Sequence, residues 1–358
     1  MTKFYPLVVR DVRRETHDCV SVSFDVPTDW AEKFTFVAGQ YLTLRADIEG
    51  EDVRRSYSIC AAPTDGDLRV AVKRVSGGTF STFAATELKA GDTLKVMPPQ
   101  GKFLVKPDPK RAQHYVGIAA GSGITPIISI MRTVLGAEAN SHFTLIYGNR
   151  AKASIIFREA LESLKNEYMS RLTVHHVLSR EKTDTPLLSG RINAEKCSQF
   201  FTKLIDIQSV DAFYLCGPET MIFEVKDWLE AANVRREAIH FELFTASSAK
   251  KQHTKTTNLV AAERDKVSHV TVCLDGLSFD FDLPYYGETI LDAATDQGAD
   301  MPFSCKGGVC CTCRARVLEG EVEMAINYAL EPDEVAAGYI LTCQSQPRSE
   351  RLVVDFDV

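Results

Sequence analysis

Four cysteines late in the chain have the spacing of ligands to a metal centre. Cys305, Cys310 and Cys313 follow the pattern C-x4-C-x2-C, and Cys343 lies downstream in the run LTCQS. Four thiolates with this spacing can hold the two irons of a [2Fe–2S] cluster. A structural zinc site is the alternative, although zinc more typically takes two C-x2-C-like pairs. We therefore expect an iron–sulfur centre with these four cysteines as its ligands.

The loop between these ligands has further features that suit a cluster. Gly307 and Gly308 let the backbone wrap closely, so its N–H groups can point at sulfur and stabilise the more negative, reduced centre. Cys311 is surplus, because using it as a ligand would break both the x4 and the x2 spacing. We expect Cys311 to lie beside the centre without a bond to iron.

The segment SGGTFS, far upstream, is suited to bind an anion. It places Gly77, Gly78 and Ser81 at the start of a short apolar helix. Backbone N–H groups at a helix N-terminus bind phosphate and similar groups. Considered alone, the segment is better explained as an ordinary tight turn.

A second glycine-rich segment, AAGSGITPI, joins an apolar strand to a helix. Gly121 and Gly123 would let the phosphates of a dinucleotide approach the backbone closely. Thr125 is expected to cap the helix, and Pro126 to occupy its first position. The spacing is shorter than the common G-x-G-x-x-G fingerprint.

Elements of two kinds must position these segments. Residues 1–108 contain short runs such as CVSVSFDV and DLRVAV, separated by Gly, Pro and Asp turns, which predict a small antiparallel β-barrel. Residues 109–245 alternate apolar strands with helical patterns, as in HYVGIAA followed by IISIMRTVL. This alternation predicts an α/β domain with a parallel, doubly wound sheet.

The chain changes character after residue 245. Residues 246–266 are polar and rich in Thr, Ser and Lys, which indicates an interdomain linker. Residues 267–358 form an α+β pattern with 16 acidic and 5 basic side chains, against 32 and 36 in the rest of the chain. This acidity argues against nucleic acid as the main partner, and it serves either docking or solubility.

Composition indicates a multidomain globular protein. At 358 residues the chain exceeds one ordinary core, and it is 45% hydrophobic and 25% charged. No apolar run approaches a membrane span and the first residues lack a signal-peptide core, so we expect a cytoplasmic protein without membrane partners. In that reducing compartment, clustered cysteines favour metal binding over disulfides.

With these motifs in this order, the chain resembles a family of electron-transfer flavoproteins. Residues 1–245 resemble the ferredoxin–NADP reductase family, and residues 267–358 resemble a plant-type ferredoxin, which implies a β-grasp-like fold. The runs CKGGVC and NYALEPDEVAAGYILTCQS are similar to those of phenylacetyl-CoA epoxidase reductase subunits. The resemblance implies FAD, NADPH and a [2Fe–2S] cluster as cofactors.

The resemblance assigns the flavin-binding pattern R-x-Y-S to the run RRSYSI. It implies that Tyr57 stacks on the isoalloxazine, that Ser58 hydrogen-bonds near flavin N5, and that Arg55 neutralises the pyrophosphate. It also makes SGGTFS the FAD phosphate segment, with FMN as the alternative flavin. Ser58 is thus one of three expected catalytic residues.

The resemblance places the nicotinamide site at the runs CGP and HFELF. Cys216 is expected near nicotinamide C4, with Gly217 and Pro218 beside it at the end of a strand. Glu242 and Phe244 complete the site, so Cys216 and Glu242 are the other two expected catalytic residues. A buried core cysteine and an ordinary terminal strand are the alternatives.

The charges that follow the strand FTLIYGN favour NADPH over NADH. Arg150 and Lys152 come next, Ser154 and Arg158 are near, and the first acid is Glu159. An NAD-specific site would favour an acidic residue for the ribose hydroxyls, whereas cations suit a 2′-phosphate. Solvated surface charges are the alternative, and Arg150 is the expected phosphate ligand.

The resemblance implies an enzyme that passes electrons from NADPH, by way of FAD and the cluster, to a di-iron oxygenase of a multicomponent complex acting on phenylacetyl-CoA. FAD converts a two-electron donor into single-electron deliveries, and the protein binds and orients the cofactors. A different aromatic-ring oxygenase is the alternative partner. A redox sensor without enzymatic activity is the alternative function.

Overall fold

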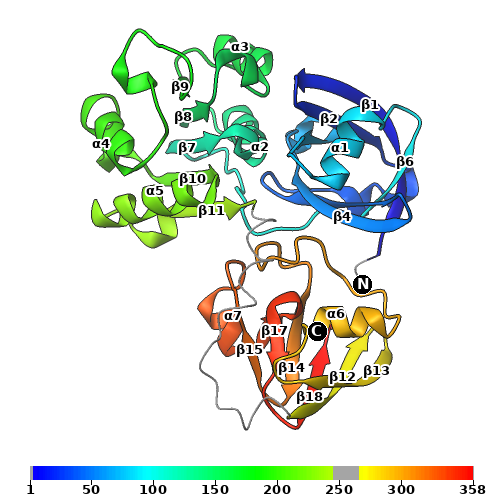
Figure 1. The fold of residues 1–358 in the computed structure, drawn as a ribbon. Coiled ribbons are helices and arrows are strands. Elements are labelled where there is room, and N and C mark those ends of the chain that lie inside the picture. The colour runs from blue at the N-terminus through cyan, green and yellow to red at the C-terminus, as the bar shows by residue number, and fades with distance from the viewer. Residues whose placement is uncertain (1–2, 245–265, 358) are drawn as a thin grey trace. The chain divides into compact units, whose positions relative to one another are not determined.

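The computed structural model describes residues 3–244 and 266–357 (Figure 1). Residues Phe4–Phe244 form one compact unit, and the described residues from Lys266 onward belong to a second. All but the last residue of the predicted linker, 246–266, lies outside the described residues. In the described ranges, no helix is both long enough and apolar enough to cross a membrane.

An antiparallel sheet of six strands begins the first unit, in the order β4-β3-β6-β1-β2-β5. An isolated bridge between Ile59 and Val70 joins the two ends of this sheet, so it closes into the predicted barrel. Helix α1 (Thr79–Thr86) packs Phe80 and Ala84 into the barrel core. The strands are β1 (Tyr5–Thr16), β2 (Cys19–Asp25), β3 (Tyr41–Ile48), β4 (Glu51–Ser58), β5 (Leu68–Lys73) and β6 (Thr93–Val96).

Strand β2 alternates apolar and polar residues, yet its polar face is buried as well as its apolar face. Arg69 covers that face and donates hydrogen bonds to Ser21 Oγ at 3.0 Å and Asp11 Oδ2 at 2.9 Å. Asp67 accepts from both Arg69 and Ser23. A hydrogen-bonded ion-pair network therefore buries side chains that alternation alone assigns to solvent.

A parallel sheet follows in the same unit, in the order β11-β10-β7-β8-β9. The chain runs outward from β7 to β9 and then restarts on the other side at β10, which makes the predicted doubly wound topology. The strands are β7 (His114–Ala120), β8 (His142–Asn149), β9 (Leu172–Leu178), β10 (Ala212–Gly217) and β11 (Ile239–Leu243). The helices are α2 (Ile124–Ala137), α3 (Arg158–Glu167), α4 (Ala194–Lys203) and α5 (Glu219–Ala231).

The second unit is built on a mixed sheet in the order β13-β12-β18-β14-β16. Strands β12 and β18 are parallel, and the β12–β13 hairpin turns at Asp275 and Gly276, whose φ values are 53° and 75°. Helix α6 (Ile290–Asp296) buries Ile290, Leu291, Ala293 and Ala294. The other elements are β12 (Val267–Leu274), β13 (Leu277–Pro284), β14 (Arg314–Glu319), β15 (Val322–Met324), α7 (Pro332–Ala336), β16 (Tyr339–Leu341), β17 (Ser345–Pro347) and β18 (Arg351–Asp355).

Candidate functional site

The four cysteines predicted as cluster ligands lie together in the second unit. Cys305, Cys310 and Cys313 belong to the loop that ends at β14, and Cys343 lies in the 3-10 turn η11 (Thr342–Gln344) after β16. The Cys305 side chain interacts with those of Cys310 and Cys343, and Cys343 also interacts with Cys313. Hydrogen bonds from Cys310 and then Cys343 lower the pKa of Cys305 well below its usual value. Hydrogen bonding to Cys305 raises the pKa of both Cys310 and Cys343 well above the usual value. Four thiol side chains gathered in one place, which can deprotonate when they bind iron, fit a cluster.

Backbone N–H groups of the loop approach the first ligand, as the glycines predict. Gly307 N donates to Cys305 Sγ at 3.3 Å. Gly308 has φ 75°, and a Cβ there would lie 2.8 Å from Ile326 O, so only glycine fits without displacing backbone. Such donors stabilise added negative charge on a cluster.

Cys311 has its own partner in this unit. Its φ is 54°, and its Sγ donates to Ala329 O at 3.2 Å. The residue is partly exposed and packs against the core of the unit. Its expected lack of a bond to iron stays a prediction.

A single metal ion is a different case from a cluster. Across residues 3–244 and 266–357, no group of three or more His, Cys, Asp or Glu side chains is arranged to hold one ion. A [2Fe–2S] cluster instead divides four thiolates between two irons.

The second candidate site lies where the order of the parallel sheet reverses. Strands β7 and β10 are neighbours, and their carboxyl ends carry the segments GSG and CGP. A Cβ on Gly123 would lie 2.0 Å from Cys216 O, so the two segments touch through backbone. Gly121 has φ 56° in the turn η4 (Gly121–Gly123). Open α/β sheets bind ligands at such a switch point.

The three predicted catalytic residues meet at this edge. Ser58 Oγ, at the end of β4 in the barrel, donates to Glu242 Oε2 at 2.8 Å. Glu242 on β11 is paired in register with Cys216 on β10. Residues 184 positions apart are thus joined directly, which couples the barrel to the parallel sheet.

Desolvation shifts the pKa values of both acidic side chains in this group upward. Desolvation raises the pKa of Glu242 to about 8, although the Ser58 hydrogen bond opposes the shift. Desolvation, and then the Glu242 charge, raise the pKa of Cys216 well above its usual value. A thiol held neutral is a poor nucleophile, so Cys216 is suited to pack against a ligand and not to attack it.

The predicted flavin residues line β4 and the start of α1. The ring centroids of Tyr57 on β4 and Phe80 on α1 are 5.6 Å apart. Arg55 is exposed on β4. Gly78 precedes α1, and Ser81 Oγ accepts from Val75 N at 3.2 Å and donates to Gly78 O. An exposed arginine on β4 and a glycine-led helix start fit a flavin diphosphate.

The start of α2 differs from the prediction. Gly123 is the N-cap and no side chain caps the helix, while Thr125 Oγ1 donates to Ser122 O at 3.0 Å. Pro126 is the third helical residue, because the turn η4 runs directly into the helix at Ile124. Proline is tolerated there, since N–H groups of the first turn lack helical partners.

Two further residues lie beside the segment predicted to bind the nicotinamide phosphate. Arg150 is exposed after β8, and its carbonyl accepts from Arg180 N at 2.8 Å. Glu181 accepts from Lys152 N at 2.6 Å. Arg180 and Glu181 follow β9, so only the pairing of β8 with β9 brings them here. The sequence signal that points to Arg180 and Glu181 is the charged run LSREK, which comes at the end of a predicted parallel strand.

Lys73 is a further candidate that the sequence analysis does not name. It ends β5, and its Nζ lies 3.7 Å from where a Cβ on Gly121 would be. A cation between the barrel and the glycine turn suits a dinucleotide phosphate. Phe244, in contrast, follows β11 and is 39% exposed. A stacking role for Phe244 therefore stays a prediction.

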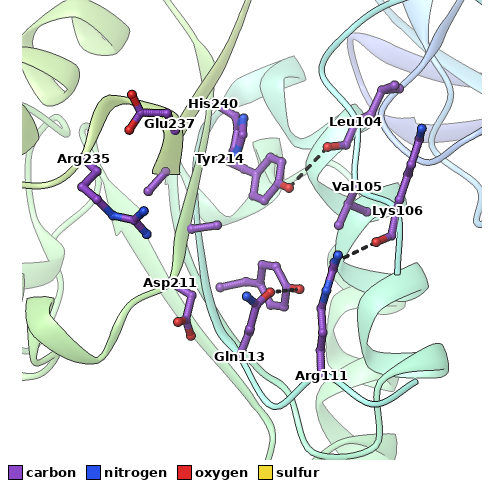
Figure 2. A pocket seen from close by; sticks show the side chains of 13 residues that line it. Leu104, Val105, Lys106, Arg111, Gln113, Asp211, Tyr214, Arg235, Glu237 and His240 are labelled. Carbon is purple, nitrogen blue, oxygen red and sulfur yellow. Dashed lines mark hydrogen bonds between the residues drawn. The ribbon is translucent and has the colours of Figure 1, made fainter. Parts of the chain in front are cut away.

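A pocket of about 310 Å³ lies at the opposite edge of the parallel sheet (Figure 2). The starts of β7, β10 and β11 and the segment after Phe103 line it. Tyr214 donates across it to Leu104 O at 3.3 Å and stacks on His240 with ring centroids 4.8 Å apart. Cys216 and Glu242 lie at the other ends of these strands. This pocket is therefore separate from the group formed by Ser58, Cys216 and Glu242, which we call the candidate hydride site.

Comparison with known proteins agrees with this architecture. Three family models match in order along the chain: an oxidoreductase FAD-binding domain at residues 6–104, an oxidoreductase NAD-binding domain at 118–227, and a 2Fe-2S iron-sulfur cluster binding domain at 270–348. These matches confirm the predicted fold classes and their order.

Two curated relatives match over nearly their full length. The chain is 44% identical to a component of the 1,2-phenylacetyl-CoA epoxidase of Escherichia coli, covering 100% of this chain and 99% of that protein. It is 35% identical to the ferredoxin reductase component of 3-ketosteroid-9-alpha-monooxygenase from Rhodococcus rhodochrous, covering 98% and 96%. The solved structure of phthalate dioxygenase reductase matches with a TM-score of 0.58 and 27% identity, covering 99% and 98%.

Proposed function

The chain belongs to the family of oxygenase reductase components that join FAD-binding, NAD-binding and [2Fe–2S] domains, and from this premise we propose that it carries electrons from NADPH to a di-iron oxygenase acting on phenylacetyl-CoA. The observation that carries the proposal is the pairing of two sites in one chain. One is the Ser58–Glu242–Cys216 group, and the other is the four-cysteine group.

The chain's own residues have distinct parts in this proposal. Ser58 and Glu242 form a hydrogen-bonded pair where flavin and nicotinamide would meet. Cys216, whose thiol is neutral and fully buried, lies next to Glu242 on the neighbouring strand. Cys305, Cys310, Cys313 and Cys343 hold the cluster. FAD supplies the conversion of one two-electron donor into single-electron deliveries.

NADPH is proposed over NADH because cations surround the end of β8. Arg150 and Arg180 both lie there, and either can form a charge-assisted bond to a 2′-phosphate. Glu181 is the competing feature, since a carboxylate suits the ribose hydroxyls of NADH. One carboxylate oxygen of Glu181 already accepts a hydrogen bond from the backbone N–H of Lys152, which leaves the other oxygen for a ligand.

The partner is proposed from the full-length similarity to the epoxidase component. The acidic C-terminal domain, with 16 Asp plus Glu against 5 Lys plus Arg, suits a basic docking face. The alternative is another aromatic-ring or steroid oxygenase, since a relative at 35% identity serves a ketosteroid monooxygenase.

Anaerobic titration with NADPH tests the proposal while flavin and cluster absorbance are recorded together. We expect both to bleach, and NADPH to act at lower concentration than NADH. Flavin bleaching without cluster bleaching would contradict the electron path. Reconstitution with the oxygenase components of the epoxidase should then consume phenylacetyl-CoA, and failure there, with ketosteroid oxygenase turnover instead, would reassign the partner.

A further inference from the structure

Gln344 directly follows the fourth predicted ligand and is almost fully buried. It ends the turn η11 and is 3% exposed. A primary amide buried this deeply must be hydrogen-bonded or it destabilises the fold. The partners of Gln344 therefore show what its side chain holds.

The Gln344 amide joins the two separate segments that carry the ligands. Its Nε2 donates to Lys306 O at 3.0 Å, and Lys306 directly follows Cys305. The same nitrogen donates to Cys343 O at 2.8 Å and lies 3.8 Å from Cys343 Sγ. One NH₂ group thus contacts both the first and the last ligand segments, 38 residues apart in the chain.

The first ligand loop has a backbone that needs such support. Lys306 has φ 48°, an uncommon conformation for a residue with a Cβ. Gln344 binds the Lys306 carbonyl, and Asp292 binds Lys306 Nζ at 2.6 Å. The stem of Gln344 also fills space above Gly308, where a Cβ would lie 3.3 Å from Gln344 Cγ.

The position of this donor has an electrostatic consequence. Reduction adds one negative charge to the cluster, and N–H groups directed at sulfur favour the reduced state. Gln344 places its N–H group near Cys343 Sγ and fixes the loop in which Gly307 N donates to Cys305 Sγ. Its amide therefore lies near one ligand sulfur and binds the loop that carries another.

We propose that Gln344 is a positioning residue that holds the first and fourth ligand segments together and raises the reduction potential of the cluster. This inference rests on the proposed ligand set, in particular on Cys305 and Cys343. It adds a residue outside the cysteine pattern whose effect is on the potential.

The test compares Gln344→Met with Gln346→Met in the full-length holoprotein. Methionine keeps the length of the side chain and removes the N–H donors. Gln346, two residues on, donates to Gly287 O at 2.5 Å and accepts from Arg348, so it is the matched control. The readouts are the midpoint potential, the half-life of cluster absorbance, and NADPH oxidation with ferricyanide.

For Gln344→Met we expect the ratio of reduced to oxidised cluster at a fixed potential to fall up to about tenfold, which is about 59 mV for a one-electron couple. Its cluster should also bleach faster, while Gln346→Met matches wild type and both oxidise NADPH normally. Wild-type potential and cluster half-life in Gln344→Met would overturn the inference.

Two further variants keep the outcomes separate. If Gln344→Met assembles no cluster, the midpoint potentials of Gln344→Glu and Gln346→Glu are compared instead. The inference then requires that the potential shifts in Gln344→Glu and not in Gln346→Glu. Cys343→Ala tests the ligand set itself. A cluster retained in Cys343→Ala would overturn the proposed ligands, whereas a cluster lost there beside normal Gln344 variants would overturn only the role of Gln344.

Discussion

The two candidate sites are built in opposite ways. The cluster site takes three of its four cysteines from one nine-residue stretch, Cys305–Cys313, and the fourth from the turn η11 in the same unit. The hydride site takes Ser58 from β4 of the barrel, Cys216 from β10 and Glu242 from β11. A loop supplies the first site, and packing between two sheets supplies the second.

The two candidate sites therefore depend on the fold in different ways. A ligand loop needs local backbone geometry, such as the positive φ of Gly308, and one remote cysteine. The hydride site exists only when the barrel and the parallel sheet are joined, because its hydrogen bond spans both. Substitutions in the first should therefore remove a cofactor, and substitutions in the second should slow a reaction.

The largest expected effect is cluster loss in Cys310→Ala. Removal of one of four thiolates leaves an iron without a ligand. The protein should lose visible cluster absorbance and the reduced-state EPR signal, and it should keep FAD and NADPH oxidation with ferricyanide. Cys311→Ala is the matched control and should retain the cluster, because Cys311 Sγ contacts Ala329 O.

The reverse outcome would break this half of the comparison. If Cys311→Ala lacked a cluster and Cys310→Ala retained one, the ligand pattern would be wrong. Loss of FAD from Cys310→Ala would show that flavin binding depends on the cysteine loop.

Ser58→Ala should slow flavin reduction by NADPH about 100-fold, because a positioned hydrogen-bonding group contributes roughly that much to proton or hydride transfer. Stopped-flow measurement of flavin bleaching gives the rate. Ser56→Ala is the control on the same strand, since Ser56 Oγ contacts Thr43 Oγ1 within the barrel. Equal rates for the two variants would remove Ser58 from the hydride site.

Most residues of the candidate cluster site could be proposed from the sequence, because three of its four cysteines are close in the chain. The Gly307 donor to sulfur follows from the loop glycines, and the structure contains it. Gln344 could not be predicted, since its contact with Lys306 depends on how η11 packs on the loop. A glutamine after a cysteine has no distinguishing pattern.

The hydride site was predicted by resemblance, residue by residue. Periodicity gave the barrel and the doubly wound sheet, but it could not place Ser58 beside Glu242. Arg180 and Glu181 were missed because the register of β8 with β9 brings them beside Arg150 and Lys152. The assigned cap at Thr125 was wrong because the turn η4 continues into α2.

Arg150→Ala should raise KM for NADPH about 10- to 100-fold and leave KM for NADH nearly unchanged. A charge-assisted bond to the 2′-phosphate contributes about 1.5–3 kcal/mol. Arg158→Ala is the control, because Arg158 lies on α3 near Glu162, with 3.5 Å between Nε and Oε1. Equal effects of Arg150→Ala on both nicotinamides would remove Arg150 from the phosphate site, and Arg180→Ala would then be the variant to measure.

The smallest expected effect is on stability, and it comes from the carboxyl of the hydride site. The pKa of Glu242 rises from an ordinary value of 4.5 to about 8 in the folded protein. The folded state therefore holds this proton more tightly than the unfolded state, so the contribution of Glu242 to stability falls as pH rises from about 5 to 8. Glu242→Gln removes the titration and keeps an oxygen that can accept from Ser58.

The melting temperature of Glu242→Gln should therefore match wild type near pH 5 and exceed it increasingly up to pH 8. Since the side chain is partly exposed, we expect a gain of about 2 kcal/mol, or about 5 °C, at the upper end. Thermal unfolding of both flavin-loaded proteins across this range measures the difference. Curves that stay parallel would show that Glu242 is ionised at neutral pH, and the hydride site would then hold a carboxylate where burial predicts a neutral acid.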